Sequence, residues 1–193
     1  MRPRQSRSDA QANLQQLLDA AFEVFSEQGA QAALDLVAER AGVSRATLYR
    51  NFADRHALMR ALLLRMLQQL QARADELSPL GPDALFAFMR HWAEAVVRTT
   101  PLLDFWRSLD RSDPTLVLAQ QQLRSMLEPL LAQALLGGRC RADLGTDDLV
   151  LIGSMFGAAR RGRTREEQLA LGQRAWELIE GGLRAPGTEG AAP

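Results

Sequence analysis

The sequence has no lysine, a single cysteine and only two histidines among its 193 residues. The lone Cys140 excludes an intramolecular disulfide, and no cysteine and histidine cluster has the spacing of a zinc site. No window approaches the ~18 consecutive apolar residues of a membrane helix, and no apolar stretch of a signal peptide follows Arg2, Arg4 and Arg7. We therefore expect a soluble, cytoplasmic protein without metal, cofactor or membrane contact.

Net charge is also lacking, because 23 basic residues are balanced by 23 acidic ones. A neutral chain does not coat nucleic acid through bulk electrostatics, so any DNA binding has to come from a local patch. Hydrophobic residues make up 47% of the chain, which is enough for a buried core and excludes global disorder.

Apolar residues recur at helical spacing almost throughout, which predicts an all-α protein. The expected helices span 9–28, 34–41, 44–51, 55–77, 83–99, 101–110, 115–136, 147–160 and 165–183. The segment Ser78–Pro82 breaks the pattern and is the predicted domain boundary. The predicted organisation is a basic arm 1–8, a three-helix domain 9–54, a connecting helix 55–77, a second helical domain 83–184, and a disordered tail 185–193.

The short helices 34–41 and 44–51 flank a tight turn at Gly42 and Val43, an arrangement typical of a helix-turn-helix. Ser44 is suited to cap the second of them. Leu48 and Phe52 have the spacing to face the first helix, so the opposite face of 44–51 is free for base edges and phosphates. Arg45 is the predicted base reader, because a guanidinium pairs bidentately with guanine.

The segment from Ala41 to Phe52, followed by Arg55 and Leu58, resembles the helix-turn-helix signature of the tetracycline-repressor (TetR) family. The resemblance is dense over about 11–65 and fades after Pro79. It implies a homodimeric transcription regulator bound to double-stranded DNA, with phosphate contacts from the second helix and the start of the next. The predicted DNA-contacting residues are Ser44, Arg45, Ala46, Thr47, Tyr49, Arg50, Arg55 and His56. Ala32 and Ala33 depart from the family, which usually has a threonine cap there.

The second domain carries an aromatic stripe that is either plain core or the wall of a pocket for a small apolar or aromatic ligand. The candidate pocket residues are Phe88, His91, Trp92 and Trp106. Cys140, in the loop 137–141, is either an exposed thiol without a special role or a redox sensor.

The last two predicted helices, 147–160 and 165–183, present more apolar surface than one subunit is expected to cover. Their small residues leave room for a partner helix or for close packing within the subunit. By resemblance to the family they pair with their symmetry mates in a four-helix bundle. The candidate interface residues are Ile152, Gly153, Phe156, Gly157, Leu169 and Trp176.

The sequence thus favours a repressor that binds a pseudo-palindromic operator as a homodimer and is released by a small molecule. A regulator without a ligand, an activator and a helical protein-interaction scaffold stay open. An enzyme is disfavoured, because the two histidines lie far apart in the sequence and neither a Gly-x-Ser-x-Gly motif nor a glycine-rich phosphate loop is present.

Overall fold

The computed structural model describes residues 7–99, 102–103, 105–106, 109–110, 112–157 and 162–186, with the side chains from residue 11 onward and without that of Arg98. The predicted arm 1–8 lies outside these residues apart from Arg7 and Ser8, where the first helix has already begun. Most of the predicted tail and parts of the predicted helix 101–110 also lie outside them.

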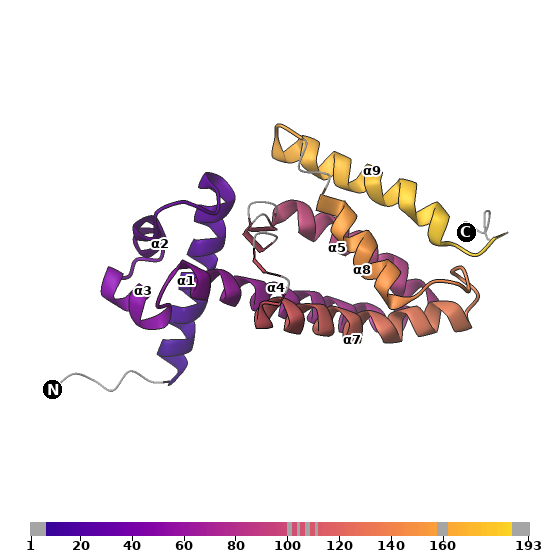
Figure 1. The fold of residues 1–193 in the computed structure, drawn as a ribbon, viewed down its shortest axis with the longest axis horizontal. Helices are drawn as coiled ribbons and strands as arrows, with labels where there is room; N and C mark the ends of the chain where they lie inside the picture. Colours follow the sequence, from indigo (N-terminus) through magenta and orange to yellow (C-terminus); the bar gives the residue numbers. More distant parts are fainter. Residues whose placement is uncertain are drawn as a thin grey trace. The chain divides into compact units, whose positions relative to one another are not determined.

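The chain is all-helical, as predicted (Figure 1). The elements are α1 (Arg7–Gln28), α2 (Leu34–Arg40), α3 (Arg45–Asn51), α4 (Arg55–Leu77), the 3-10 helix η1 (Ser78–Asp83), α5 (Ala84–Arg98), α7 (Pro114–Leu136), α8 (Thr146–Met155) and α9 (Arg165–Leu183). The β pairing among the described residues is one isolated antiparallel bridge between Cys140 and Arg184. None of the described helices is long and apolar enough to cross a membrane.

The structure divides the chain at points that differ from the predicted boundary at Ser78–Pro82. The N-terminal unit comprises 1–65 together with 101–110, and the C-terminal unit comprises 66–100 and 111–193. The indole nitrogen of Trp106 donates a hydrogen bond to the carbonyl of Met59 at 3.2 Å. A segment far along the sequence is therefore part of the N-terminal unit, and the break at 78–83 lies inside the C-terminal unit.

Helix α1 buries one apolar face in the core of the N-terminal unit. This face packs with apolar residues of the other helices of that unit. The buried residues are Leu17, Leu18, Ala21, Val24, Phe25, Val37, Leu48, Phe52, Leu58 and Met59. Arg40 at the end of α2 braces α1 from outside through Glu23 at 3.1 Å and Glu27 at 2.9 Å. The hydrogen bond from Arg40, together with its charge, holds the pKa of Glu27 below its usual value.

Helix α5 is the centre of the C-terminal unit and packs against α7, α8, α9 and η1 (Figure 1). A chain of aromatic rings joins three helices: the ring centroids of Phe88 and Trp92 lie 6.1 Å apart, those of Trp92 and Phe156 6.5 Å, and those of Phe156 and Trp176 6.4 Å. Gly153 lies flat against Trp92, because a Cβ atom there would be 2.2 Å from the indole Cη2. This cluster is the core of the unit.

The end of α9 is tied back to the loop after α7. The amide of Arg141 donates to the carbonyl of Leu183 at 3.0 Å, and that of Ala185 donates to Arg139 at 3.2 Å, so the predicted tail is paired at its first residue. Cys140 is one of the paired residues and has 4% of its surface exposed, and burial raises the pKa of its thiol. The interpretation as an exposed thiol is therefore wrong.

Candidate nucleic-acid interface

The turn between α2 and α3 is fixed by the backbone of Gly42. This residue has a φ of 65°, in the left-handed region that favours glycine. Its amide donates to the carbonyl of Glu39 at 3.0 Å, and the next amide, of Val43, donates to Ala38 at 3.0 Å. These bonds end α2 and set the direction in which α3 starts.

Ser44 caps α3 as predicted, since its hydroxyl accepts from the amide of Thr47 at 3.1 Å. The same hydroxyl lies 2.9 Å from the hydroxyl of Thr47, which also accepts from Nη2 of Arg50 at 2.9 Å. Asn51 donates its side-chain amide to the carbonyl of Thr47 at 2.8 Å. Three of the predicted DNA-contacting side chains are thus joined to one another before any DNA is present.

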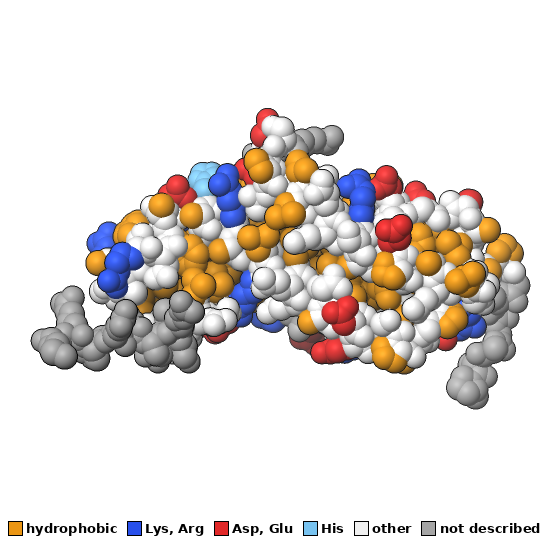
Figure 2. Space-filling view, turned by 90° about the horizontal axis from the view of Figure 1, so that it is seen from below, with side chains coloured by type: hydrophobic (Ala, Val, Ile, Leu, Met, Phe, Trp, Pro, Cys, Tyr) orange, Lys and Arg blue, Asp and Glu red, His pale blue; other side chains and the backbone are white. Residues whose placement is uncertain are grey.

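The two faces of α3 differ as the sequence predicts. Leu48 is 1% exposed and faces the core, whereas Tyr49 is 46% exposed. Ser44, Arg45, Ala46 and Arg50 are exposed as well, and Thr47 is half-buried between them. Figure 2 shows arginine side chains on the visible face of the N-terminal unit, at the left of the view. A neutral protein therefore still presents positive charge beside a helix of the right size for the major groove.

Arg45, the predicted base reader, is held by a partner that the sequence did not predict. Its Nε lies 2.7 Å from the carboxylate of Asp35 in the first turn of α2, and its side chain remains 68% exposed. An acid and a base ten positions apart carry no helical or strand spacing, so only the turn between the helices reveals this pair.

Arg55 has a role inside the N-terminal unit. Its Nη1 donates to the carbonyl of Ala30 and its Nη2 to that of Ala32, each at 2.7 Å, and the guanidinium carbon lies 5.5 Å from the ring centroid of Phe25. These carbonyls belong to the loop between α1 and α2, where Ala33 supplies no side-chain cap. Arg55 therefore clamps this loop, and its phosphate contact stays a prediction.

His56, the next residue of α4, is exposed, and its ring lies 5.1 Å from that of Phe105. Phe105 and Trp106 are both buried in the N-terminal unit. The start of α4 is thus covered by a segment that is connected in sequence to α5 on one side and α7 on the other.

The four candidate pocket residues do not come together in one unit. Phe88, His91 and Trp92 belong to the C-terminal unit, whereas Trp106 belongs to the N-terminal unit. Phe88 and Trp92 are fully packed in the aromatic cluster, and His91 is half-buried. A different residue stands out there: the buried indole nitrogen of Trp176 has no hydrogen-bond acceptor among the described residues. A buried donor without a partner is uncommon in folded proteins.

The candidate interface residues divide into buried and peripheral ones. Gly153, Phe156, Gly157 and Trp176 are buried by their own subunit, because they pack in or beside the aromatic cluster, whereas Ile152 and Leu169 are half-buried. The same two helices expose other large apolar residues, namely Leu151 and Met155 on α8 and Leu171 and Leu178 on α9. Close packing within the subunit therefore accounts for the small residues.

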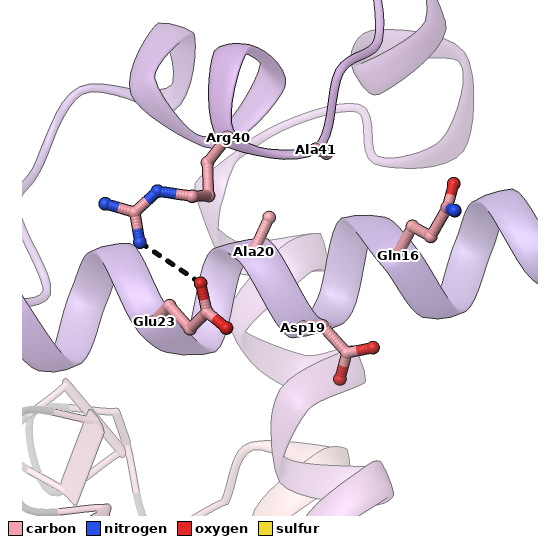
Figure 3. Close-up of a pocket in the computed structure, with 6 residues that line it drawn as sticks. All are labelled: Gln16, Asp19, Ala20, Glu23, Arg40 and Ala41. Atoms are coloured by element: carbon pink, nitrogen blue, oxygen red, sulfur yellow. Dashed lines mark hydrogen bonds and ion pairs between the residues drawn. The ribbon is translucent and has the colours of Figure 1, made fainter.

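A shallow hollow of about 220 Å³ lies between α1 and the end of α2 (Figure 3). Asp19 and Glu23 line it from α1, and Arg40 reaches across to Glu23 from the other side. Two carboxylates with one arginine that already pairs with acids do not attract a phosphate. The ion pair across this hollow therefore joins two helices, and the hollow is not part of the DNA-contacting face.

Comparisons with known proteins agree with this geometry. Residues 17–62 match the family model described as bacterial regulatory proteins, tetR family. A TetR transcriptional regulator from Streptomyces coelicolor has 29% sequence identity and a TM-score of 0.70, over 89% of this chain and 98% of that one. A TetR regulatory protein from Mycobacterium vanbaalenii has 28% identity and a TM-score of 0.69, over 93% and 99% of the two chains.

The repressor of the Stenotrophomonas maltophilia multidrug efflux pump SmeDEF, at 19% identity, shares the fold with a TM-score of 0.62 over 93% of this chain and 94% of its own. No curated protein sequence matches the chain. The fold and the exposed face of α3 define a DNA-binding helix-turn-helix protein. Residues 17–62 form a DNA-binding domain of the tetR type, and the chain is similar to TetR transcription regulators over most of its length.

The role of Arg55 can be tested with Arg55→Lys, which keeps the charge but cannot bridge two carbonyls with a planar fork. Because hydrogen bonds from charged groups contribute about 1.5–3 kcal/mol each, we expect the N-terminal unit to lose stability on this order. Hydrogen exchange at amides of α1 and α2 measures the loss, with Arg60→Lys on an exposed position of the same helix as control. An equally stable Arg55→Lys variant would contradict the clamp, and a flatter salt dependence of DNA affinity in Arg55→Ala would support the phosphate anchor.

Proposed function

We propose that this protein is a repressor that binds a pseudo-palindromic operator as a homodimer and releases it when a small molecule binds. The single observation that carries the proposal is the exposed face of α3, on which Arg45, Tyr49 and Arg50 stand beside the Ser44 cap. A helix that served only for packing has no need of these side chains together. The proposed site of action is the cytoplasm, where bacterial DNA lies.

In this proposal α3 enters the major groove. Arg45 pairs with a guanine, since its terminal amino groups match the O6 and N7 acceptors. Tyr49 and the network of Ser44, Thr47 and Arg50 contact phosphates, which fixes the register of the helix without reading sequence. Prior hydrogen bonds within the network reduce the freedom that these side chains lose on binding.

The dimer supplies the second reading helix, because one such helix contacts too few base pairs for a useful specificity ratio. We place the interface on the outward faces of α8 and α9, with Leu151, Met155, Leu171 and Leu178 in place of the buried candidates. Each pair has helical spacing, four residues apart on α8 and seven on α9, so each lies on one face of its helix. Covering these side chains removes apolar surface from water, the usual driving force for such pairing.

The ligand in this proposal is a small apolar or aromatic molecule with one hydrogen-bond acceptor. Its acceptor would satisfy the indole N–H of Trp176 beside the aromatic cluster, and the rings would supply the apolar wall.

The signal would pass through the segment that carries Phe105 and Trp106. It is anchored on α4 by the bond from Trp106 to Met59, and its two ends continue into α5 and α7. A shift of either helix therefore pulls on α4, the helix that follows α3 in sequence. A tenfold loss of operator affinity requires only about 1.4 kcal/mol of differential binding.

Base reading is tested by selecting binding sites from random duplexes with the parent and with Arg45→Ala. We expect the parent to select a two-fold repeat, and the variant to lose preference at one base pair of each half-site, equivalent to about 1–3 kcal/mol. Arg124→Ala is a matched control, because Arg124 is 46% exposed and lies on α7, away from α3 in sequence. Unchanged selection with Arg45→Ala would contradict this assignment.

The dimer is tested by light scattering at micromolar concentration without DNA. We expect the parent to be dimeric and Leu178→Glu to be monomeric. The helical content should be kept, because the side chain of Leu178 is 67% exposed and its loss removes little packing within the subunit. Leu136→Glu, at an apolar position that is 90% exposed at the end of α7, should stay dimeric. A monomeric parent would refute the arrangement.

The ligand is tested by titrating a panel of small aromatic compounds against the complex of the protein with its selected site. For a compound that releases the parent, Trp176→Phe should need an about fivefold higher concentration, because the lost hydrogen bond is worth roughly 1 kcal/mol. Trp106→Phe should bind the compound normally but release less DNA, because only its bond to Met59 is removed. If both variants behave as the parent does, the ligand site and the route lie elsewhere.

A further inference from the structure

The ion pair between Asp35 and Arg45 joins the two helices of the motif on the side where Arg45 is exposed. One carboxylate oxygen of Asp35 lies 2.7 Å from Nε of Arg45, and the two side chains are 48% and 68% exposed. An exposed ion pair contributes little to folding stability. What it does contribute is a restriction on the position of a long side chain.

The atom that Asp35 engages is informative. Nε is the guanidinium nitrogen nearest to the backbone, and the carboxylate of Asp35 lies closest to this nitrogen. In the proposed complex the two terminal amino groups of Arg45 bind the O6 and N7 acceptors of guanine. Asp35 can therefore hold the inner nitrogen of the guanidinium while the two terminal amino groups bind a nucleobase.

The backbone keeps the two residues in reach of each other. Arg45 is the first residue of α3, directly after the Ser44 cap, and Asp35 is in the first turn of α2. The left-handed Gly42 and the bonds of the turn set the angle between these helices. The turn between α2 and α3 therefore keeps Asp35 and Arg45 close together.

We propose that Asp35 is a positioning residue that sets the base preference of the protein through Arg45. This inference rests on the proposed function, in which Arg45 reads a base. Asp35 acts on DNA binding in two separate ways. The carboxylate restricts the rotamers of Arg45 before DNA arrives, which favours the correct base, and its negative charge repels phosphates, which weakens binding to every sequence.

A structural role for Asp35 makes a different prediction. Ala33 gives α2 no side-chain cap, so the acidic residue in its first turn also interacts favourably with the helix N-terminus. Loss of that interaction would lower the unfolding temperature whether or not Arg45 is present. It would not change which base is preferred.

The test is a double-mutant cycle on Asp35→Ala and Arg45→Ala at one fixed salt concentration. Affinity is measured for the selected site, for the same site with the Arg45-dependent base pair exchanged, and for an unrelated duplex. We expect Asp35→Ala to lower discrimination between the first two about tenfold in the parent and less than about twofold with Arg45→Ala, and to strengthen binding to the unrelated duplex.

Two further variants complete the test. Asp35→Asn should keep part of the discrimination, because its amide oxygen can still lie against the guanidinium of Arg45. Glu39→Ala removes an exposed carboxylate from the same helix that does not pair with Arg45, and it should leave discrimination unchanged. If Asp35→Asn keeps part of the base discrimination and Glu39→Ala does not change it, the positioning role of Asp35 is supported.

Each other outcome overturns the inference in a distinguishable way. If Arg45→Ala changes discrimination and Asp35→Ala does not, Asp35 positions nothing and the proposed function stands. If Asp35→Ala lowers discrimination equally without Arg45, Asp35 contacts a base itself. If Arg45→Ala leaves discrimination unchanged at all base pairs, the base-reading assignment and the inference fail together.

Discussion

The guanidinium of Arg55 connects three parts of the N-terminal unit at a single point. It reaches from the first turn of α4 to the carbonyls of Ala30 and Ala32, and it lies over the ring of Phe25 on α1. The loop it holds leads directly into α2, so the start of α2 and the placement of Asp35 depend on it. The geometry of α3 follows from there, through Gly42 and the Ser44 cap.

The sequence predicts those features of the fold that depend on residues close together in the chain. The bounds 55–77 and 165–183 agree with α4 and α9, because each helix has an apolar period and a polar cap or break at its ends. The two faces of α3 and the cap at Ser44 also follow from spacing and side-chain type. The family assignment needed only these local features.

Contacts between residues far apart in the sequence cannot be predicted from spacing and residue type. Arg55 was interpreted as a phosphate anchor because nothing local indicates that the carbonyls of Ala30 and Ala32 lie within its reach. Trp106 was grouped with Phe88 and Trp92 by composition, whereas its indole bonds to α4. Gly153 suited a partner helix as well as it suits Trp92, and only the tertiary structure separates the two.

The burial of Cys140 has a practical consequence for measurement. The chain has one thiol, and it is buried where the loop after α7 pairs with the end of α9 and has a raised pKa, so little of it is thiolate at neutral pH. A cysteine introduced on the exposed face of the N-terminal unit would therefore take a maleimide dye or spin label selectively, without removal of the native one. The distance between two such labels in a dimer would report directly on the separation of the reading helices.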